Sequence, residues 1–346
     1  MPGGIALLRV LSRSPNFFNS GTLKRVERAS SVDLIARQDN GNAKFQDPRV
    51  TADGSARASV TLRELRTLWI NTGTLCNLTC ENCYIKSSPS NDALVYINRG
   101  EVQAYLAEIA QLELPVSEIG FTGGEPFMNP DLLDMVADCL ATGVRVLILT
   151  NAMRPMMKCA AELLLLHNKY ADRLAIRVSV DHFNPHLHSQ ERGKRSWRPM
   201  IKGLRWLSEQ GMHLQVAGRR RWGEDEQTLR AGFAVLFAEL GVNVDAEDPA
   251  ALTLFPEMDE NAELPEITTA CWGILGVDPA SIMCASSRMV VKRKHERKPV
   301  VVACTLLPYE AEFSYGSKLA DSLGTVALNH PHCASFCVLG GGSCSP

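Results

Sequence analysis

The sequence carries almost no net charge and has no long apolar run. Its 346 residues include 36 basic and 38 acidic side chains, which gives a formal net charge of −2. This balance does not favour nucleic acid or an acidic membrane as a partner, and the basic runs "GRRRW" (218–222) and "VKRKHERK" (291–298) are expected to be solvated turns. No apolar stretch is long enough to span a membrane, and the opening residues are too weakly apolar for a secretory signal. The sequence therefore predicts a cytoplasmic protein.

Cysteine, in contrast, is abundant, with 11 residues. Cytoplasmic thiols stay reduced, so clustered cysteines there point to metal rather than to disulfides. Three of them, Cys76, Cys80 and Cys83, lie in the stretch "TLCNLTCENCY". A structural zinc ion usually takes four ligands, whereas three thiolates can hold three corners of a four-iron cluster and leave one iron free. A zinc loop with a distant fourth ligand is the alternative.

Residues 65–256 alternate between strand-like and helix-like segments. The expected strands are 65–71, 116–122, 144–150, 174–181, 213–218 and 251–256; the expected helices between them are 99–112, 129–143, 157–170, 198–211 and 225–241. Repeated βα units predict an α/β fold with a parallel sheet, here a partial (β/α)6 TIM-like barrel, with an open doubly wound sheet as the alternative. In either fold the site lies at the carboxyl ends of the strands, where the cysteine loop begins.

The chain divides into three parts by composition. Residues 1–64 are polar and are expected to form an irregular N-terminal extension. Residues 65–256 are expected to form the barrel core. Residues 257–346 hold six of the 11 cysteines and few helical periods, which is typical of a small domain that is held together by metal.

Two motifs together resemble the radical S-adenosylmethionine (SAM) superfamily. "CNLTCENC" matches its three-cysteine signature, and "GFTGGEPFMNPDLL" places a GGEP turn after the second expected strand. The glycines of such a turn let the backbone approach a ligand closely. The resemblance implies that Gly123, Gly124, Glu125 and Pro126 bind the amino group of SAM. Taken alone, this stretch is better explained as an ordinary turn, in which Gly-Gly before Pro is common; its place after the expected strand 116–122, downstream of the cysteines, favours the SAM-binding turn.

Weaker similarities to the superfamily occur at the ends of the next expected strands. "LTNA" (149–152) stands where relatives often carry Thr-Asn-Gly, and Ser179 and Asp181 stand where relatives contact the SAM ribose. In the expected loop "SQERGKRSW", the resemblance makes Arg192 a candidate partner for the SAM carboxylate, and a solvated loop arginine is the alternative. The sequence departs from many relatives just before the third cysteine, where Asn82 replaces an aromatic residue.

The cysteine-rich tail resembles, more loosely, the SPASM and twitch extensions that carry auxiliary clusters. Residues 283–310 are expected to form a β-hairpin with a charged turn. The resemblance implies a second iron–sulfur cluster on Cys284, Cys304, Cys333 and Cys337, with Cys344 as the leading substitute. The full seven-cysteine pattern is missing, and a structural zinc site is the alternative.

The resemblance implies the following reaction. A 4Fe–4S cluster receives an electron from a low-potential donor such as flavodoxin or ferredoxin, cleaves SAM, and yields a 5′-deoxyadenosyl radical that abstracts hydrogen from the substrate. The substrate would be a peptide, as in maturases, or a small nucleotide-like molecule. No catalytic residue of the protein itself is assigned. The alternative function is a non-catalytic iron–sulfur sensor or scaffold, which would not need the GGEP turn.

Overall fold

The computed structural model describes residues 43–259 and 262–344. Residues 1–42, most of the expected N-terminal extension, lie outside this range. Six parallel strands form the main sheet, in the order β7-β6-β5-β4-β3-β2. They are β2 (Thr67–Asn71), β3 (Glu118–Thr122), β4 (Arg145–Thr150), β5 (Leu174–Ser179), β6 (His213–Arg220) and β7 (Leu252–Pro256). The predicted parallel (β/α)6 arrangement is therefore confirmed, and each strand begins and ends near its expected position.

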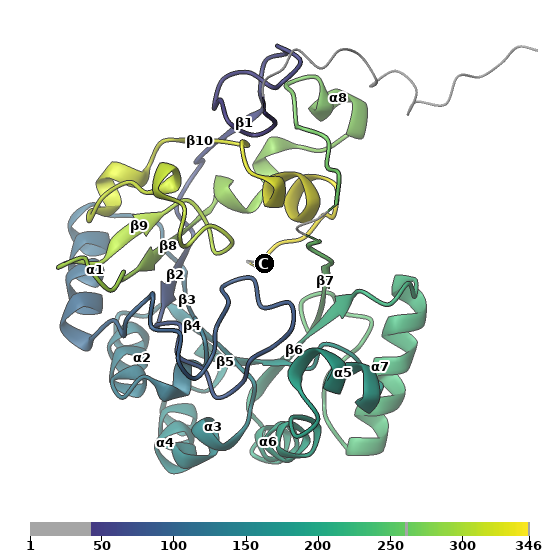
Figure 1. The fold of residues 1–346 in the computed structure, drawn as a ribbon. Helices are drawn as coiled ribbons and strands as arrows, with labels where there is room; N and C mark the ends of the chain where they lie inside the picture. The colour runs from purple at the N-terminus through teal and green to yellow at the C-terminus, as the bar shows by residue number, and fades with distance from the viewer. Residues whose placement is uncertain (1–42, 260–261, 345–346) are drawn as a thin grey trace, which may run out of the picture. The chain divides into compact units, whose positions relative to one another are not determined.

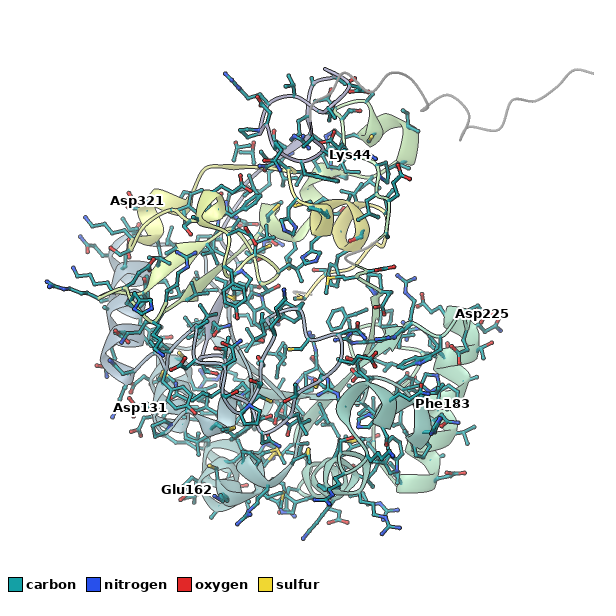
Figure 2. All side chains as sticks on the ribbon, viewed as in Figure 1. Lys44, Asp131, Glu162, Phe183, Asp225 and Asp321 are labelled. Carbon is teal, nitrogen blue, oxygen red and sulfur yellow. The ribbon has the colours of Figure 1, made fainter. Side chains whose placement is uncertain are left out.

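Helices connect these strands and follow the outer face of the curved sheet (Figure 1). They are α1 (Arg99–Gln111), α2 (Leu132–Ala141), α3 (Arg154–Lys158), α4 (Ala160–Tyr170), α5 (Pro185–Arg192), α6 (Trp197–Glu209) and α7 (Glu226–Leu240). Local signals fix their ends: Asp225, labelled in Figure 2, accepts from the Thr228 amide at 2.7 Å, and Gly241 ends α7 in the left-handed conformation. Within 43–259 and 262–344, no helix is long and apolar enough to cross a membrane.

Two helical segments differ from expectation. The segment expected as a single helix over 157–170 is split at Cys159 into α3 and α4. The segment expected to be a loop after β5 begins with the short helix α5. Asn184 caps α5 by accepting from the His186 amide at 2.8 Å, and Pro185 occupies its first turn. Helix α5 was not predicted because its residues are almost all polar and show no apolar periodicity.

The two faces of the sheet pack into two different cores. On the outer face, alternate strand residues such as Ile176 and Val178 pack against the helices. On the inner face, Trp69, Leu147 and Ala175 pack into a core that also contains the tail. Trp69 is fully buried, and a side chain on its strand neighbour Gly120 would collide with the indole ring. Both faces of the parallel sheet are thus covered, as such sheets require.

The tail continues the same sheet instead of standing apart from it. Strand β8 (Ser287–Val291) pairs in parallel with β2, and β9 (Val300–Val302) pairs antiparallel with β8. This antiparallel pair confirms the hairpin expected over 283–310. Residues 43–64, expected to be irregular, include β1 (Ser59–Thr61), which pairs with β10 (Thr325–Ala327) of the tail. The domain boundaries predicted at residues 64 and 256 stay predictions.

Candidate functional site

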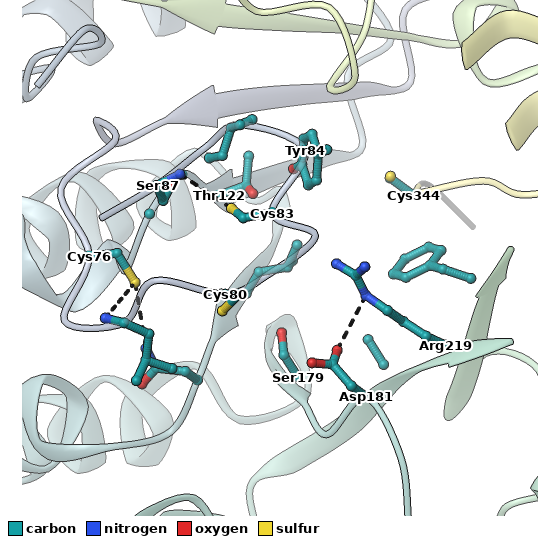
Figure 3. Close-up of a pocket in the computed structure, with 18 of the residues that line it drawn as sticks. Cys76, Cys80, Cys83, Tyr84, Ser87, Thr122, Ser179, Asp181, Arg219 and Cys344 are labelled. Atoms are coloured by element: carbon teal, nitrogen blue, oxygen red, sulfur yellow. Dashed lines mark hydrogen bonds and ion pairs between the residues drawn. The ribbon is translucent and has the colours of Figure 1, made fainter. Parts of the chain in front are cut away.

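A cavity opens at the carboxyl ends of the strands, which we call the cofactor cavity. Its lining comes from the cysteine loop, from the ends of β3 to β7 and from the tail. Figure 3 shows Cys76, Cys80 and Cys83 on the loop, with Cys344 of the tail across from them. The other predicted site residues in its lining are Gly123, Gly124, Pro126, Ser179, Asp181 and Arg192. Residues far apart in sequence therefore meet at the end of the sheet where a parallel α/β fold places its ligand.

The three thiols of the loop are all free and share this one cavity. Cys76 is buried, and burial raises its pKa to about 12. Backbone amides point at two of the sulfurs: the Leu78 amide lies 3.4 Å from Cys76 Sγ, and the Ser87 amide lies 3.4 Å from Cys83 Sγ. Amide hydrogen bonds to sulfur stabilise a thiolate ligand and tune the potential of an iron–sulfur cluster.

The GGEP turn packs directly on the chain that leads into Cys76. The Gly124 amide donates to Gly73 O at 2.8 Å, and the Glu125 amide donates to Leu75 O at 3.1 Å. Gly123 has φ +140°, and a Cβ there would lie 2.6 Å from Gly73 O. The two glycines are therefore needed for a close approach of two backbones, and the turn fixes where the cysteine loop begins.

We expect Gly124→Ala to lower both stability and iron loading. The new Cβ would lie 2.3 Å from Leu75 O, and backbone cannot move aside as a flexible side chain can. The free energy of unfolding should fall by about 1–3 kcal/mol, measured by denaturant titration, with a parallel loss of iron after anaerobic reconstitution. Gly324→Ala is the matched control, because its Cβ would meet nothing within 4 Å. Equal iron content in the two variants would contradict a role for this packing.

Glu125 is buried and, unlike its neighbours, does not line the cavity. Its carboxylate accepts from Thr150 Oγ1 at 2.8 Å and from the Asn151 amide at 2.9 Å. Asn151 in turn donates through Nδ2 to Asn77 Oδ1 at 2.9 Å, on the cysteine loop. Burial raises the pKa of Glu125 to about 7. In this structure Glu125 joins the end of β4 to the loop, and its predicted contact with SAM stays a prediction.

Asp181 and Arg192 are brought together as an ion pair. Arg192 Nε donates to Asp181 Oδ2 at 2.5 Å, and Arg192 Nη2 donates to Oδ1 at 3.1 Å. Although burial favours the neutral acid, Arg192 and Arg219 lower the pKa of Asp181. Ser179 lies on the same strand end and faces the same cavity (Figure 3). The two residues predicted as separate SAM contacts therefore form one charged unit at the cavity wall.

Glu191 is a site residue that the sequence analysis missed. Its buried carboxylate accepts from the Asn82 amide and from Asn82 Nδ2, both at 2.9 Å, and from Arg221 Nη1 at 2.8 Å. Its carbonyl accepts from the Glu81 amide at 2.9 Å. Glu191 thus holds the segment between Cys80 and Cys83 from α5. This contact also explains the departure at Asn82, because an amide side chain can pair with the carboxylate and an aromatic ring cannot.

The expectation of a solvated turn at 218–222 is wrong. Arg219 and Arg220 belong to β6, and Arg219 lines the cofactor cavity. Arg219 lies 3.5 Å from Asp181 and 3.7 Å from Glu191, and its Nη2 donates to Asn82 O at 3.1 Å. The physical reason is that side chains alternate between the two faces of a strand. Because β6 ends at the site, its basic run places positive charge next to the buried acids there. The sequence signal was the position of the run at a strand end.

The tail gathers five buried thiols: Cys284, Cys304, Cys333, Cys337 and Cys344. Burial raises the pKa of Cys337, and the four other thiols of this group raise it further because they lie close by. Cys333 and Cys337 share one helical turn, η7 (Cys333–Val338), whereas Cys284 and Cys304 flank the hairpin. Cys344 also lines the cofactor cavity, and Thr305 Oγ1 donates to its sulfur at 3.3 Å. The structure therefore brings together all the predicted tail ligands.

Both cysteine groups are compatible with an iron–sulfur cluster. Among the described residues, no three His, Cys, Asp or Glu side chains converge closely enough to hold one metal ion. The ligands of a four-iron cluster bind different irons, so they surround a larger volume and need not converge on one point. A thiol-only donor set also suits iron–sulfur chemistry, since soft thiolates are its usual ligands.

Comparisons with known proteins agree with this site. A model of the radical SAM superfamily matches residues 70–219. Antilisterial bacteriocin subtilosin biosynthesis protein AlbA of Bacillus subtilis is 29% identical over 143 residues, which are 41% of this chain and 30% of AlbA. GTP 3′,8-cyclase of Rhodococcus opacus is 35% identical over 125 residues, which are 35% of this chain and 31% of the cyclase. The match therefore spans about a third of each curated relative.

A solved structure supports the fold over a longer stretch. That of Streptococcus suis SuiB bound to the precursor peptide SuiA superposes with a TM-score of 0.53 at 13% identity. The superposition covers 76% of this chain and 64% of SuiB. It therefore extends beyond the residues that the superfamily model matches, and it is a likeness of fold alone.

Proposed function

Because residues 70–219 match a model of the radical SAM superfamily, we propose that this protein cleaves SAM reductively and uses the resulting radical to modify a substrate. The observation that carries the proposal is the meeting of the three loop thiols and the GGEP turn in one cavity. Three thiolates leave one iron of a 4Fe–4S cluster free, and the turn next to it offers backbone groups for the amino group of SAM. A non-catalytic sensor or scaffold would not need a turn that binds SAM, so the enzyme is the better-supported hypothesis.

In this proposal the protein binds, orients and shields the reacting groups. Cys76, Cys80 and Cys83 hold the cluster, which with SAM supplies a 5′-deoxyadenosyl radical able to abstract hydrogen. Gly123 and Gly124 present backbone to the amino group. Arg192 binds the carboxylate of SAM, and Asp181 positions Arg192, to which it is already hydrogen bonded.

Ser179 is the proposed contact for the ribose, at the end of β5. Phe255, Leu306 and Phe336 line the side of the cavity that the tail covers. These apolar groups exclude water from the site, which protects a reactive intermediate from side reactions.

For the tail we propose a second cluster on Cys284, Cys304, Cys333 and Cys337, with Cys344 as the substitute ligand. All five thiols are buried, and none is bonded to another as a disulfide. Four protein ligands would leave no iron free for SAM, so this cluster would relay electrons or support the fold. A structural zinc ion is the competing occupant.

For the substrate we propose a peptide. AlbA takes part in bacteriocin biosynthesis, and SuiB has been solved with a precursor peptide. The likeness to GTP 3′,8-cyclase keeps a nucleotide as the second candidate. The electron would come from a low-potential donor such as flavodoxin or ferredoxin in the cytoplasm, a setting in which eleven free cysteines persist.

The direct test is cofactor cleavage by the purified protein. After anaerobic reconstitution with iron and sulfide, dithionite and SAM should give 5′-deoxyadenosine slowly without substrate, measured by chromatography and mass spectrometry. Asp181→Asn should raise the Kd for SAM roughly tenfold, because it weakens the pair that orients Arg192. Glu239→Gln, an exposed acid on α7, is the matched control. A cluster-loaded protein that forms no 5′-deoxyadenosine would favour the sensor.

A further inference from the structure

A second cavity of about 490 Å³ lies on the inner face of the sheet, and we call it the arginine chamber. The interior of a closed barrel is ordinarily filled by branched apolar side chains. Here the strands contribute charged and polar side chains beside apolar ones such as Leu147 and Phe255, and a glycine segment forms one wall. The residues that matter are Glu118, Arg177, Gln215, Arg220, Thr253 and the glycines 340–342. A cavity with a few buried charged groups among apolar side chains, in place of a packed core, is typical of a ligand site.

Arg177 is the most unusual of these residues, because among the described residues this buried cation contacts no carboxylate directly. Its side chain belongs to β5, and the residue is only 4% exposed. Nε donates to Gln215 Oε1 at 3.0 Å, and Nη1 donates to Cys344 O at 3.1 Å. Among the described residues, no carboxylate comes within 4.0 Å of it. Burial lowers the pKa of Arg177, and the nearby charges of Cys344 and Glu118 do not offset that effect. Burying a charge without a contacting counter-ion is costly, so the site favours an anion brought by a ligand.

Two further polar atoms in the chamber lack a hydrogen-bond partner among the described residues, although their side chains have other partners. Arg220 Nη2 donates to Gly340 O at 2.7 Å, but the buried Nε has no hydrogen-bond acceptor among the described residues. Glu118 Oε1 is likewise buried without a donor within that part of the chain, and Glu118 is 8% exposed. Unsatisfied buried polar atoms are rare in native proteins, and a bound ligand is one of their explanations.

The charges of the chamber select the kind of anion. Glu226 lies 2.8 Å from Arg230 and 3.9 Å from Arg220. Counting the whole lining, Arg177, Arg220 and Arg230 stand against Glu118 and Glu226, which leaves an excess of one positive charge. A single carboxylate balances that excess. A triphosphate brings several negative charges and would also face Glu118, so the chamber disfavours a nucleoside triphosphate.

The chamber and the cofactor cavity are neighbours on the same strands. Arg177 stands two residues before Ser179 on β5, and side chains two apart in a strand face the same side. The offset along the strand is roughly 7 Å, the reach of one extended residue or one long side chain. Phe255 lines both cavities. A group held by Arg177 would therefore place an adjoining C–H close to the cofactor.

We propose that the arginine chamber binds the carboxylate of an acidic peptide residue, and that the modified position is this residue or its neighbour. The inference rests on the proposed function and narrows its substrate class to acidic peptides. Arg177 and Arg220 hold the carboxylate. The backbone of 340–342 forms the wall along which the peptide enters, since Glu226, Ala250 and Gly341 at the rim are exposed.

The test compares two short peptides on the iron-loaded full chain. Acetyl-Gly-Glu-Gly-amide should bind roughly tenfold more tightly than acetyl-Gly-Gln-Gly-amide, because charge-assisted bonds to arginine exceed neutral ones. Saturation-transfer NMR measures both. Arg220→Gln should remove the preference, and Arg220→Lys should keep part of it. Arg198→Gln on α6 is the matched control, an exposed arginine outside the chamber. Arg177→Gln provides a second variant if Arg220→Gln misfolds.

Each outcome decides the proposal. Equal binding of the two peptides, no binding at millimolar concentration, or a preference that survives both arginine changes would overturn it. GTP that binds more tightly than the acidic peptide and displaces it would assign the chamber to a nucleotide instead. Formation of 5′-deoxyadenosine by the wild-type protein is measured separately, so a failure of the chamber and a failure of the proposed enzyme are distinguishable.

Discussion

Changing Cys76, Cys80 and Cys83 together to Ala should remove about four irons per chain and abolish 5′-deoxyadenosine formation. All three sulfurs face one cavity, and no other thiol of the loop can replace them. Without the cluster there is no electron to cleave SAM, so activity should fall to the uncatalysed background and not to a reduced level. Iron and sulfide content are measured after anaerobic reconstitution, together with the visible absorbance of the iron–sulfur cluster.

The control removes three cysteines that belong to neither group. Cys139 is buried in α2, Cys159 stands between α3 and α4, and Cys271 begins α8 (Cys271–Leu275). The triple change of these residues to Ala should keep full iron content. If the loop variant also keeps its full iron content, the loop is not the cluster site and the proposed enzyme is lost with it.

The tail should hold a second set of about four irons that does not depend on the loop. In the protein that lacks the three loop cysteines, an iron–sulfur signal should persist and should vanish when Cys284 and Cys304 are also changed to Ala. These two thiols are buried beside the other tail thiols, so their loss should also lower Tm, because the tail core loses the metal that holds it.

The metal found there separates two explanations. Iron with cluster absorbance supports an auxiliary cluster, whereas zinc without absorbance would make the tail a structural zinc site and leave a single cluster. Cys271→Ala in the same background is the control, because Cys271 is half-buried and belongs to neither thiol group. Loss of the signal in that control would show that the tail simply unfolds.

The parts of the site that local sequence determines were predictable. The three cysteines and the GGEP turn are each recognised from a short stretch of sequence, and the alternation of strands and helices placed both at the same end of the sheet, where they meet. Six strands were found near their actual positions for the same reason. Apolar runs bounded by turn residues are a signal that tertiary contacts seldom override.

The charged contacts could not be predicted, because they join elements that only the fold brings together. Glu191 meets Asn82 across 109 positions, and Arg219 meets Asn82 across 137 positions. Helix α5 was missed because it is polar and short. Its stability comes from an N-cap and from the burial of Glu191, and neither leaves an apolar period in the sequence.

The pairing of β2 with β8 sets an order of events during synthesis. Strand β2 leads directly into the cysteine loop, but one of its two neighbours is made only when residues 287–291 leave the ribosome. Until then an apolar edge of the sheet is open to other chains, and the loop lacks support on that side. Iron is therefore expected to enter a finished chain and not a growing one. A chain that ends prematurely after β7 is expected to aggregate. It would contain all three loop thiols but would lack β8, the strand that pairs with β2 beside the loop.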